Sequence, residues 1–153
     1  MAEDVLGWAD AGLGGDHAPG PGRPLTVLVI DASTALSISS SGAHLEGGPL
    51  IAPPLLWSEV TSFVNRAAWR GDLTRPVASA VLESFLRLPI QRRTPDDLYR
   101  VATEIAAALG WAKTHDAEYV ALARLEGCSL LTADGRLKRG AGHLVDIVGP
   151  TGS

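Results

Sequence analysis

The sequence has little of what several protein classes require. It holds one cysteine, Cys128, so an internal disulfide is impossible. Its longest aliphatic runs, such as residues 27–30, are far shorter than the roughly 20 residues of a membrane-spanning helix. The first residues are acidic and include no apolar signal-peptide core, which leads us to expect a cytoplasmic protein without membrane contact. Because Cys128 adjoins an apolar run, we interpret it as a buried structural thiol.

Positive charge is also scarce. The chain carries 13 lysines and arginines against 17 aspartates and glutamates, a formal net charge of -4. Binding nucleic acid by bulk electrostatics requires clustered cations that neutralise phosphates. Any nucleic-acid chemistry must therefore be local, carried by a metal ion and a few arginines.

Length and composition favour one folded domain behind a tail. A chain of 153 residues that is 46% hydrophobic can bury a sizeable core. Residues 1–24 are dense in glycine and proline, which predicts a flexible N-terminal tail. Residues 25–150 are expected to form the domain.

Short apolar runs alternate with helical patterns along this domain. Strands are expected at residues 26–30, 50–52, 89–91, 128–132 and 143–148. Helices are expected directly after Asp31 and over residues 55–70, 76–88, 95–109 and 115–126, with Phe63, Val77 and Leu125 among their inward residues. The run at 26–30 is continuous rather than alternating, which indicates a strand buried on both faces. The pattern predicts an α/β fold, a three-layer α/β/α sandwich with a mainly parallel sheet.

Four carboxylates occupy the ends of these expected elements. Asp31 and Asp134 follow apolar strand-like runs, while Glu59 and Asp116 lie in helical segments. Sites in parallel sheets gather at the carboxyl ends of the strands, so convergence of the four is expected. Their mutual repulsion would require a cation. Oxygen ligands without a Cys or His cluster favour Mg²⁺ or Mn²⁺ over Zn²⁺.

Each acid also has a simpler interpretation. Asp31 could cap the helix that follows it. Asp116 could complement the dipole of its own helix, and Asp134 precedes a glycine in a turn signal. Glu59 is harder to explain in this way, because Phe63 stands where an i,i+4 basic partner would be.

Four segments of the chain together resemble a known family. These segments are residues 29–33, 54–60, 115–123 and 130–137. In order and spacing they resemble the PIN-domain ribonuclease toxins of VapBC toxin–antitoxin systems, over residues 25–148. The resemblance implies a Mg²⁺- or Mn²⁺-dependent endoribonuclease, the toxin of a type II system, with a cognate antitoxin that covers the site and a homodimeric state.

Carried over by position, the resemblance assigns roles to the acids. Asp31 and Asp116 would be the principal metal ligands, with Asp134 as a further direct or water-mediated ligand. Glu59 would be a ligand or a base that orients water. Two small polar residues would support the site: Ser33 and Thr132. Many relatives have an asparagine three residues after the glutamate, where this chain has Ser62.

The expected chemistry is hydrolysis of an RNA phosphodiester by metal-activated water, which leaves a 5′-phosphate. The residues considered for holding the RNA backbone are Arg66, Arg70, Arg136, Lys138 and Arg139. A solvated surface role is the alternative for each. Three tryptophans, Trp57, Trp69 and Trp111, could line a partner surface or pack in the core.

Competing functions remain open at this point. The nearest are a PIN-like nuclease in RNA or DNA processing without a toxin role, and a degenerate PIN fold acting as a protein-interaction module. The dipeptide His115-Asp116 also occurs in metal-dependent phosphohydrolases, but those need further His and Asp residues. A phosphatase of the haloacid dehalogenase type would need a second aspartate where Ser33 stands.

Overall fold

The computed structural model describes residues 26–42 and 48–150; the expected tail at residues 1–24 lies outside them. The strands are β1 (Leu28–Ile30), β2 (Leu50–Ala52), β3 (Ile90–Arg92), β4 (Ser129–Leu131) and β5 (Ile147–Val148). The helices are α2 (Ala32–Ser41), α3 (Leu55–Arg70), α4 (Arg75–Leu86), α5 (Leu98–Leu109), α6 (His115–Glu126) and α7 (Gly135–Ala141).

The strands of the described region form one sheet in the order β3-β2-β1-β4-β5, and every neighbouring pair is parallel. Strand β1 is central, because Val29 pairs with Ile51 of β2 on one side and with Leu130 of β4 on the other. All three side chains are fully buried. The predicted α/β architecture with a parallel sheet is confirmed.

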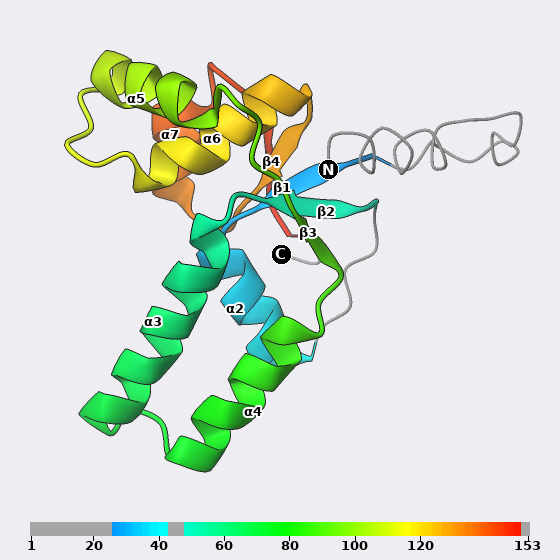
Figure 1. Ribbon diagram of the computed structural model, residues 1–153, viewed down its shortest axis with the longest axis vertical. Helices are drawn as coiled ribbons and strands as arrows, with labels where there is room; N and C mark the ends of the chain where they lie inside the picture. The colour runs from blue at the N-terminus through cyan, green and yellow to red at the C-terminus, as the bar shows by residue number, and fades with distance from the viewer. Residues whose placement is uncertain (1–25, 43–47, 151–153) are drawn as a thin grey trace, which may run out of the picture.

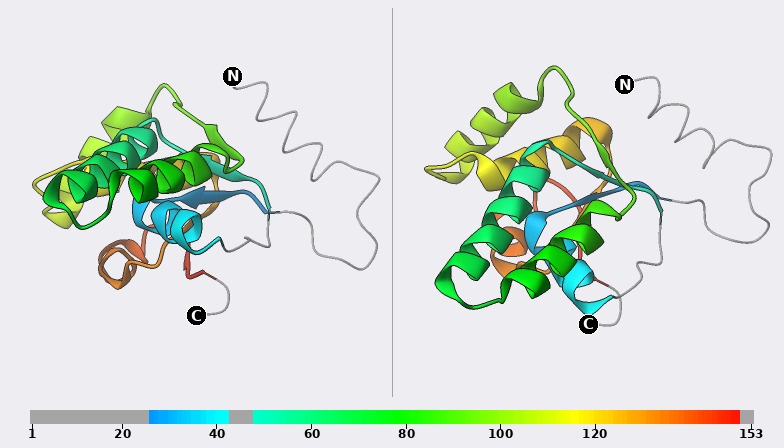
Figure 2. Two further views of the ribbon diagram at one scale, coloured as in Figure 1. Left: turned by 90° about the horizontal axis from the view of Figure 1, so that it is seen from below. Right: turned by 60° about the horizontal axis from the view of Figure 1, so that its bottom comes forward.

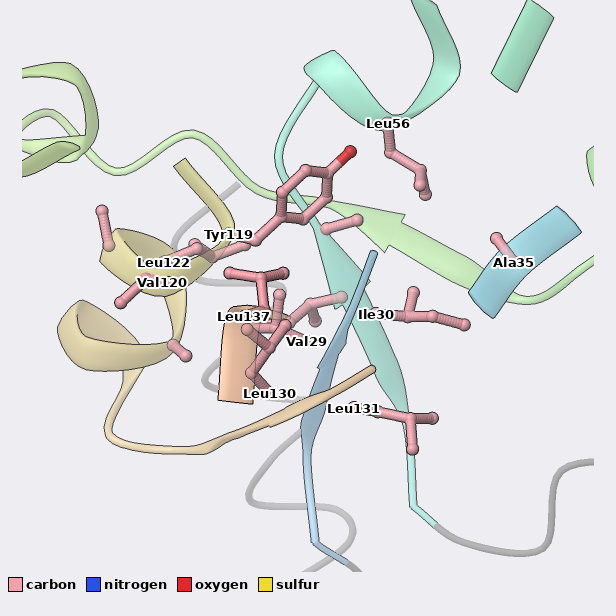
Figure 3. Close-up of a cluster of buried hydrophobic side chains, with 14 of the residues drawn as sticks. Val29, Ile30, Ala35, Leu56, Tyr119, Val120, Leu122, Leu130, Leu131 and Leu137 are labelled. Atoms are coloured by element: carbon pink, nitrogen blue, oxygen red, sulfur yellow. The ribbon is translucent and has the colours of Figure 1, made fainter. Parts of the chain in front are cut away.

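Side chains alternate across the sheet and bind a helical layer to each face. In Figure 3, Val29 and Leu130 point toward α6, whereas Ile30 and Leu131 point to the other side, where Ala35 of α2 lies. Helix α5 packs on α6, and α3 and α4 pack on α2. The result is the expected three-layer sandwich.

Helices α3 and α4 form an antiparallel pair that extends away from the sheet. Figure 1 shows this pair at the end of the molecule opposite α5, α6 and α7, and both views of Figure 2 keep α3 and α4 side by side. In the described part of the chain, no helix combines the length and apolarity needed to cross a bilayer.

Several local predictions were wrong. Helix α5 begins at Leu98 rather than at residue 95, with Asp97 at its N-cap position. The last strand covers only Ile147–Val148, because α7 and the turn after it occupy residues 135–144. Helix α7 was not expected, since Asp134 and Gly135 were read as a turn.

Three residues expected to face inward are exposed instead: Phe63 at 53%, Val77 at 46% and Leu125 at 38%. Val77 and Leu125 lie in the first and last turns of their helices, where less of the neighbouring structure covers them. Phe63 lies in the middle of α3 and lines a pocket described below.

Candidate active site

Asp31 stands at the carboxyl end of the central strand and begins a helix. It is the N-cap of α2, where its Oδ1 accepts hydrogen bonds from Thr34 N at 3.0 Å and Ser33 Oγ at 3.3 Å. The residue is only 5% exposed. The capping interpretation of Asp31 is therefore confirmed, and the same geometry fixes its carboxylate at the edge of the sheet.

Thr132 joins the ends of β1 and β4. Its hydroxyl donates to Asp31 Oδ2 at 2.5 Å and accepts a bond from Asp134 N at 2.9 Å. Thr34, which sequence reasoning did not select, reinforces this link because its Oγ1 accepts a bond from Ala133 N at 3.1 Å. Two threonines therefore hold the loop that carries Asp134 against the strand end that carries Asp31.

Asp134 is the N-cap of α7 and accepts a bond from Arg136 N at 2.8 Å. Its other oxygen receives the Arg136 guanidinium at 3.1 Å. Partial burial would raise the pKa of Asp134, but the hydrogen bonds and positive charge of Arg136 outweigh this effect and lower it. Asp134 is therefore held as a carboxylate.

Asp116 lies in the first turn of α6, as its sequence position predicted. Its Oδ2 is 3.6 Å from the same Arg136 nitrogen that binds Asp134. One guanidinium nitrogen thus lies between carboxylates carried by α6 and by the start of α7. The arrangement places a positive charge where two acids would otherwise repel each other.

Glu59 projects from α3 toward α6. Tyr119 of α6 donates its phenolic hydrogen to Glu59 Oε1 at 2.5 Å, across 60 residues of sequence. Tyr119 is 1% exposed, and burial together with the bond to Glu59 raises the pKa of its hydroxyl, which therefore stays a donor. Figure 3 shows the Tyr119 hydroxyl reaching from α6 toward the start of α3, where Leu56 lies.

Two residues near Glu59 were missed by sequence reasoning. Tyr119 had a weak signal, since a tyrosine inside an apolar helical stretch needs a partner for its hydroxyl. Glu118 gave none beyond being an acid next to apolar residues. It is 8% exposed, and burial raises its pKa, opposed by His115 and assisted by the charge of Glu59.

One pocket of about 820 Å³ gathers the predicted acids. Its lining includes Asp31, Glu59, Asp116 and Asp134, together with Ser33, Ser62 and Phe63. Of the described lysines and arginines, Arg66, Lys113 and Arg136 line it. Arg70, Lys138 and Arg139 are outside that lining. Thr132 is also outside it and donates a hydrogen bond to Asp31, which lines the pocket.

The pocket suits a hard cation by its donor set. Within residues 26–42 and 48–150, no three Asp, Glu, His or Cys side chains stand close enough together to hold a metal ion. The four acids nevertheless line one pocket, and a guanidinium already balances two of them. Carboxylate oxygens are the ligands that Mg²⁺ and Mn²⁺ prefer. The types of residue that line the pocket therefore fit such an ion.

A parallel sheet with a pocket at the carboxyl ends of its strands defines the class of open α/β proteins, which bind their ligands at that edge. The particular family follows from comparison. The PIN domain profile matches residues 29–142, and the chain belongs to this family.

Individual relatives agree with this assignment. A VapC ribonuclease of Mycobacterium bovis is 34% identical over 115 residues, which cover 72% of this chain and 88% of the relative. Ribonuclease VapC12 of Mycobacterium tuberculosis is 30% identical over 128 residues, covering 79% and 97%. VapBC2 of Rickettsia felis, solved bound to a DNA fragment from its promoter, shares the fold with a TM-score of 0.62 at 10% identity, covering 81% of this chain and 98% of that one. The resemblance to VapC-like PIN domains is confirmed.

Proposed function

We propose that this protein is an endoribonuclease and the toxin component of a type II toxin–antitoxin system. The observation that carries the proposal is the gathering of Asp31, Glu59, Asp116 and Asp134 around one pocket at the carboxyl edge of the sheet. Support comes from the relatives, which are VapC ribonucleases. RNA hydrolysis accounts for both the acidic pocket and the ribonuclease activity named for the relatives.

Asp31, Asp116, Asp134 and Glu59 would hold Mg²⁺ or Mn²⁺. When bound, such an ion acidifies water and neutralises charge at the phosphodiester that is cleaved. Thr132 holds Asp31 in place, and Ser33 donates to the same carboxylate. Glu59 lines the pocket with one oxygen fixed by Tyr119, and it would bind the ion or orient water.

Cations at the pocket would position the RNA backbone. Arg66, Lys113 and Arg136 line the pocket and carry the positive charge that phosphates require. Arg70 lies one helical turn after Arg66 on α3, and Arg139 lies on α7, so both can contact RNA that extends beyond the pocket. This local set is consistent with a chain whose net charge is negative.

A cognate antitoxin is the proposed protein partner, and the solved VapBC2 neighbour supports it. The protein surface offers apolar contacts for such a partner or for a second copy of the chain, since Phe63, Trp69 and Leu86 of the α3–α4 pair are each more than half exposed. We expect the toxin to act in the cytoplasm as a homodimer.

The test is cleavage of a mixed pool of structured RNA by the purified chain with Mg²⁺ or Mn²⁺, beside an EDTA control. Metal-dependent cuts that carry 5′-phosphates are expected. Because Asp31 also caps α2, Asp116→Asn is the cleaner inactive variant, since Asp116 has a 44% exposed side chain. Cutting that persists in EDTA, or 2′,3′-cyclic phosphate ends, would contradict the proposal.

A toxin role has its own test. Induced expression of the chain in bacteria should arrest growth, and co-expression of the protein encoded beside its gene should restore growth. Growth arrest that is equal with Asp116→Asn would show that arrest does not depend on the acidic pocket.

A further inference from the structure

A second pocket adjoins the acidic one. It has a volume of about 490 Å³ and shares with its neighbour Glu59, Lys113, His115, Asp116 and Arg136. Its own residues come from the loop between α5 and α6 and from α7, and they include Trp111 and Leu137. The two pockets therefore share part of their lining, and a ligand in the smaller one lies beside Glu59 and Asp116.

The position of Trp111 is set by the backbone around it. Gly110 ends α5 with φ of +70°, a conformation that favours glycine, and Trp111 N donates to Ala106 O at 2.8 Å. On the other side, a Cβ added at Gly140 would stand 3.1 Å from Trp111 Cζ2, so the indole lies against the backbone of α7. The half-buried side chain is thus held between α5 and α7 while it lines the pocket.

The chemistry of the lining selects a ligand. Glu59 and Asp116 disfavour an anion in the pocket, whereas an uncharged aromatic ring can stack on an indole. Lys113, which is exposed and lines both pockets, is placed to meet a phosphate next to that ring. A volume within the roughly 300–1,000 Å³ of ligand pockets leaves room for a flat base. Proteins read single-stranded RNA by stacking unpaired bases on aromatic side chains in this way.

We propose that the smaller pocket binds one unpaired nucleobase of the RNA, adjacent to the phosphodiester that is cleaved, by stacking on Trp111. The inference rests on the proposed ribonuclease activity and names the element that selects the cleavage site. Trp111 is a positioning residue, since it holds the substrate without touching the bond that breaks.

The first test uses the full chain with a pool of single-stranded RNAs of random sequence and Mg²⁺. Sequencing the cut ends gives the base preference at each position around the cut. Trp111→Ala should flatten the preference at one position next to the cut and raise KM about tenfold with kcat little changed. Trp111→Phe, which keeps an aromatic ring, should retain most of the preference.

Trp69→Ala is the matched control. Trp69 is 78% exposed on α3, and the described residues that line the two pockets do not include it. Its loss should leave the base preference unchanged. An unchanged preference in Trp111→Ala with cleavage intact, or equal changes in both variants, would overturn the nucleobase site while leaving the ribonuclease function standing.

A second measurement needs neither cleavage nor a Trp111 variant. RNA carrying a photoreactive uridine is crosslinked to the Asp116→Asn chain, and the modified peptide is identified by mass spectrometry. Crosslinks to residues 110–113 are expected, and crosslinks found only elsewhere would overturn the proposal.

Failure of the unmutated chain to cut any RNA would instead contradict the proposed function. If Trp111→Ala weakens antitoxin binding but leaves the base preference unchanged, the pocket is a protein contact and the proposal fails.

Discussion

The Tyr119 hydroxyl donates a 2.5 Å hydrogen bond to Glu59 Oε1, joining α6 to α3 at the rim of the acidic pocket. The phenol is buried and holds one carboxylate oxygen of Glu59, a residue that lines the pocket. A single pair of side chains therefore sets the orientation of the only predicted site acid that lies inside a helix rather than in its first turn or at its start.

Replacing Tyr119 with phenylalanine should lower kcat/KM for RNA cleavage about tenfold, since a hydrogen bond to a charged group is lost and Glu59 becomes free to rotate. The fold should survive, because the ring remains in the core. Cleavage kinetics and thermal unfolding measure the two effects. The other tyrosine, Tyr99, is 53% exposed on α5, and Tyr99→Phe should change neither. Equal rates for Tyr119→Phe and the unmutated chain would refute the positioning role.

A second prediction concerns Thr132, whose hydroxyl donates a hydrogen bond to Asp31 and accepts one from Asp134 N. Thr132→Val removes a donor from a buried carboxylate and an acceptor from a backbone amide, which should lower the free energy of unfolding by about 1–3 kcal/mol. Thr132→Ser keeps the hydroxyl and should lose much less. Urea denaturation of the metal-free protein measures both variants. If Thr132→Val destabilises the protein no more than Thr132→Ser, the hydrogen bonds of the hydroxyl are not the main contribution of Thr132.

The sequence predicted the parts of this structure that depend on short stretches of chain. The aliphatic run before Asp31 indicated a buried strand, and the parallel sheet that follows from it brought Asp31 and Asp134 to one edge. The pairing of Tyr119 with Glu59 joins residues 60 positions apart, and the local sequence indicates that each needs a polar partner without indicating which one. The bridging position of Arg136 depends on α7, which begins after Asp134 accepts a hydrogen bond from Arg136 N. The Asp-Gly dipeptide does not show whether a turn or a helix follows it.

Cys128 offers a test of burial that is independent of the site. Cys128 is half-buried, and this burial, assisted by the charge of Glu126, raises the pKa of its thiol above its ordinary value to about 11. Since only the thiolate is alkylated, a higher pKa means less reactive sulfur at any lower pH. At pH 8 iodoacetamide should modify the folded chain roughly a hundredfold more slowly than the denatured chain, with the rate rising about tenfold per pH unit. Mass spectrometry over time measures the rate; fast labelling of the folded protein would show that the thiol is open to solvent.

Arg136 yields the last prediction, because its guanidinium bridges Asp134 at 3.1 Å and Asp116 at 3.6 Å. A divalent cation held by these acids must compete with that positive charge. The ion pairs of Arg136 contribute little binding energy, because its side chain is 74% exposed to solvent. Arg136→Gln should therefore raise the affinity for Mn²⁺, measured by calorimetry without RNA, about two- to fivefold. The same change should raise the pKa of Asp134, since the side-chain hydrogen bond and the charge of Arg136 are lost while the backbone hydrogen bonds remain. Arg139→Gln on the same helix, outside the described linings of both pockets, is the control and should bind Mn²⁺ like the unmutated chain. Unchanged or weaker Mn²⁺ binding by Arg136→Gln would mean that the arginine and the metal ion do not share these carboxylates.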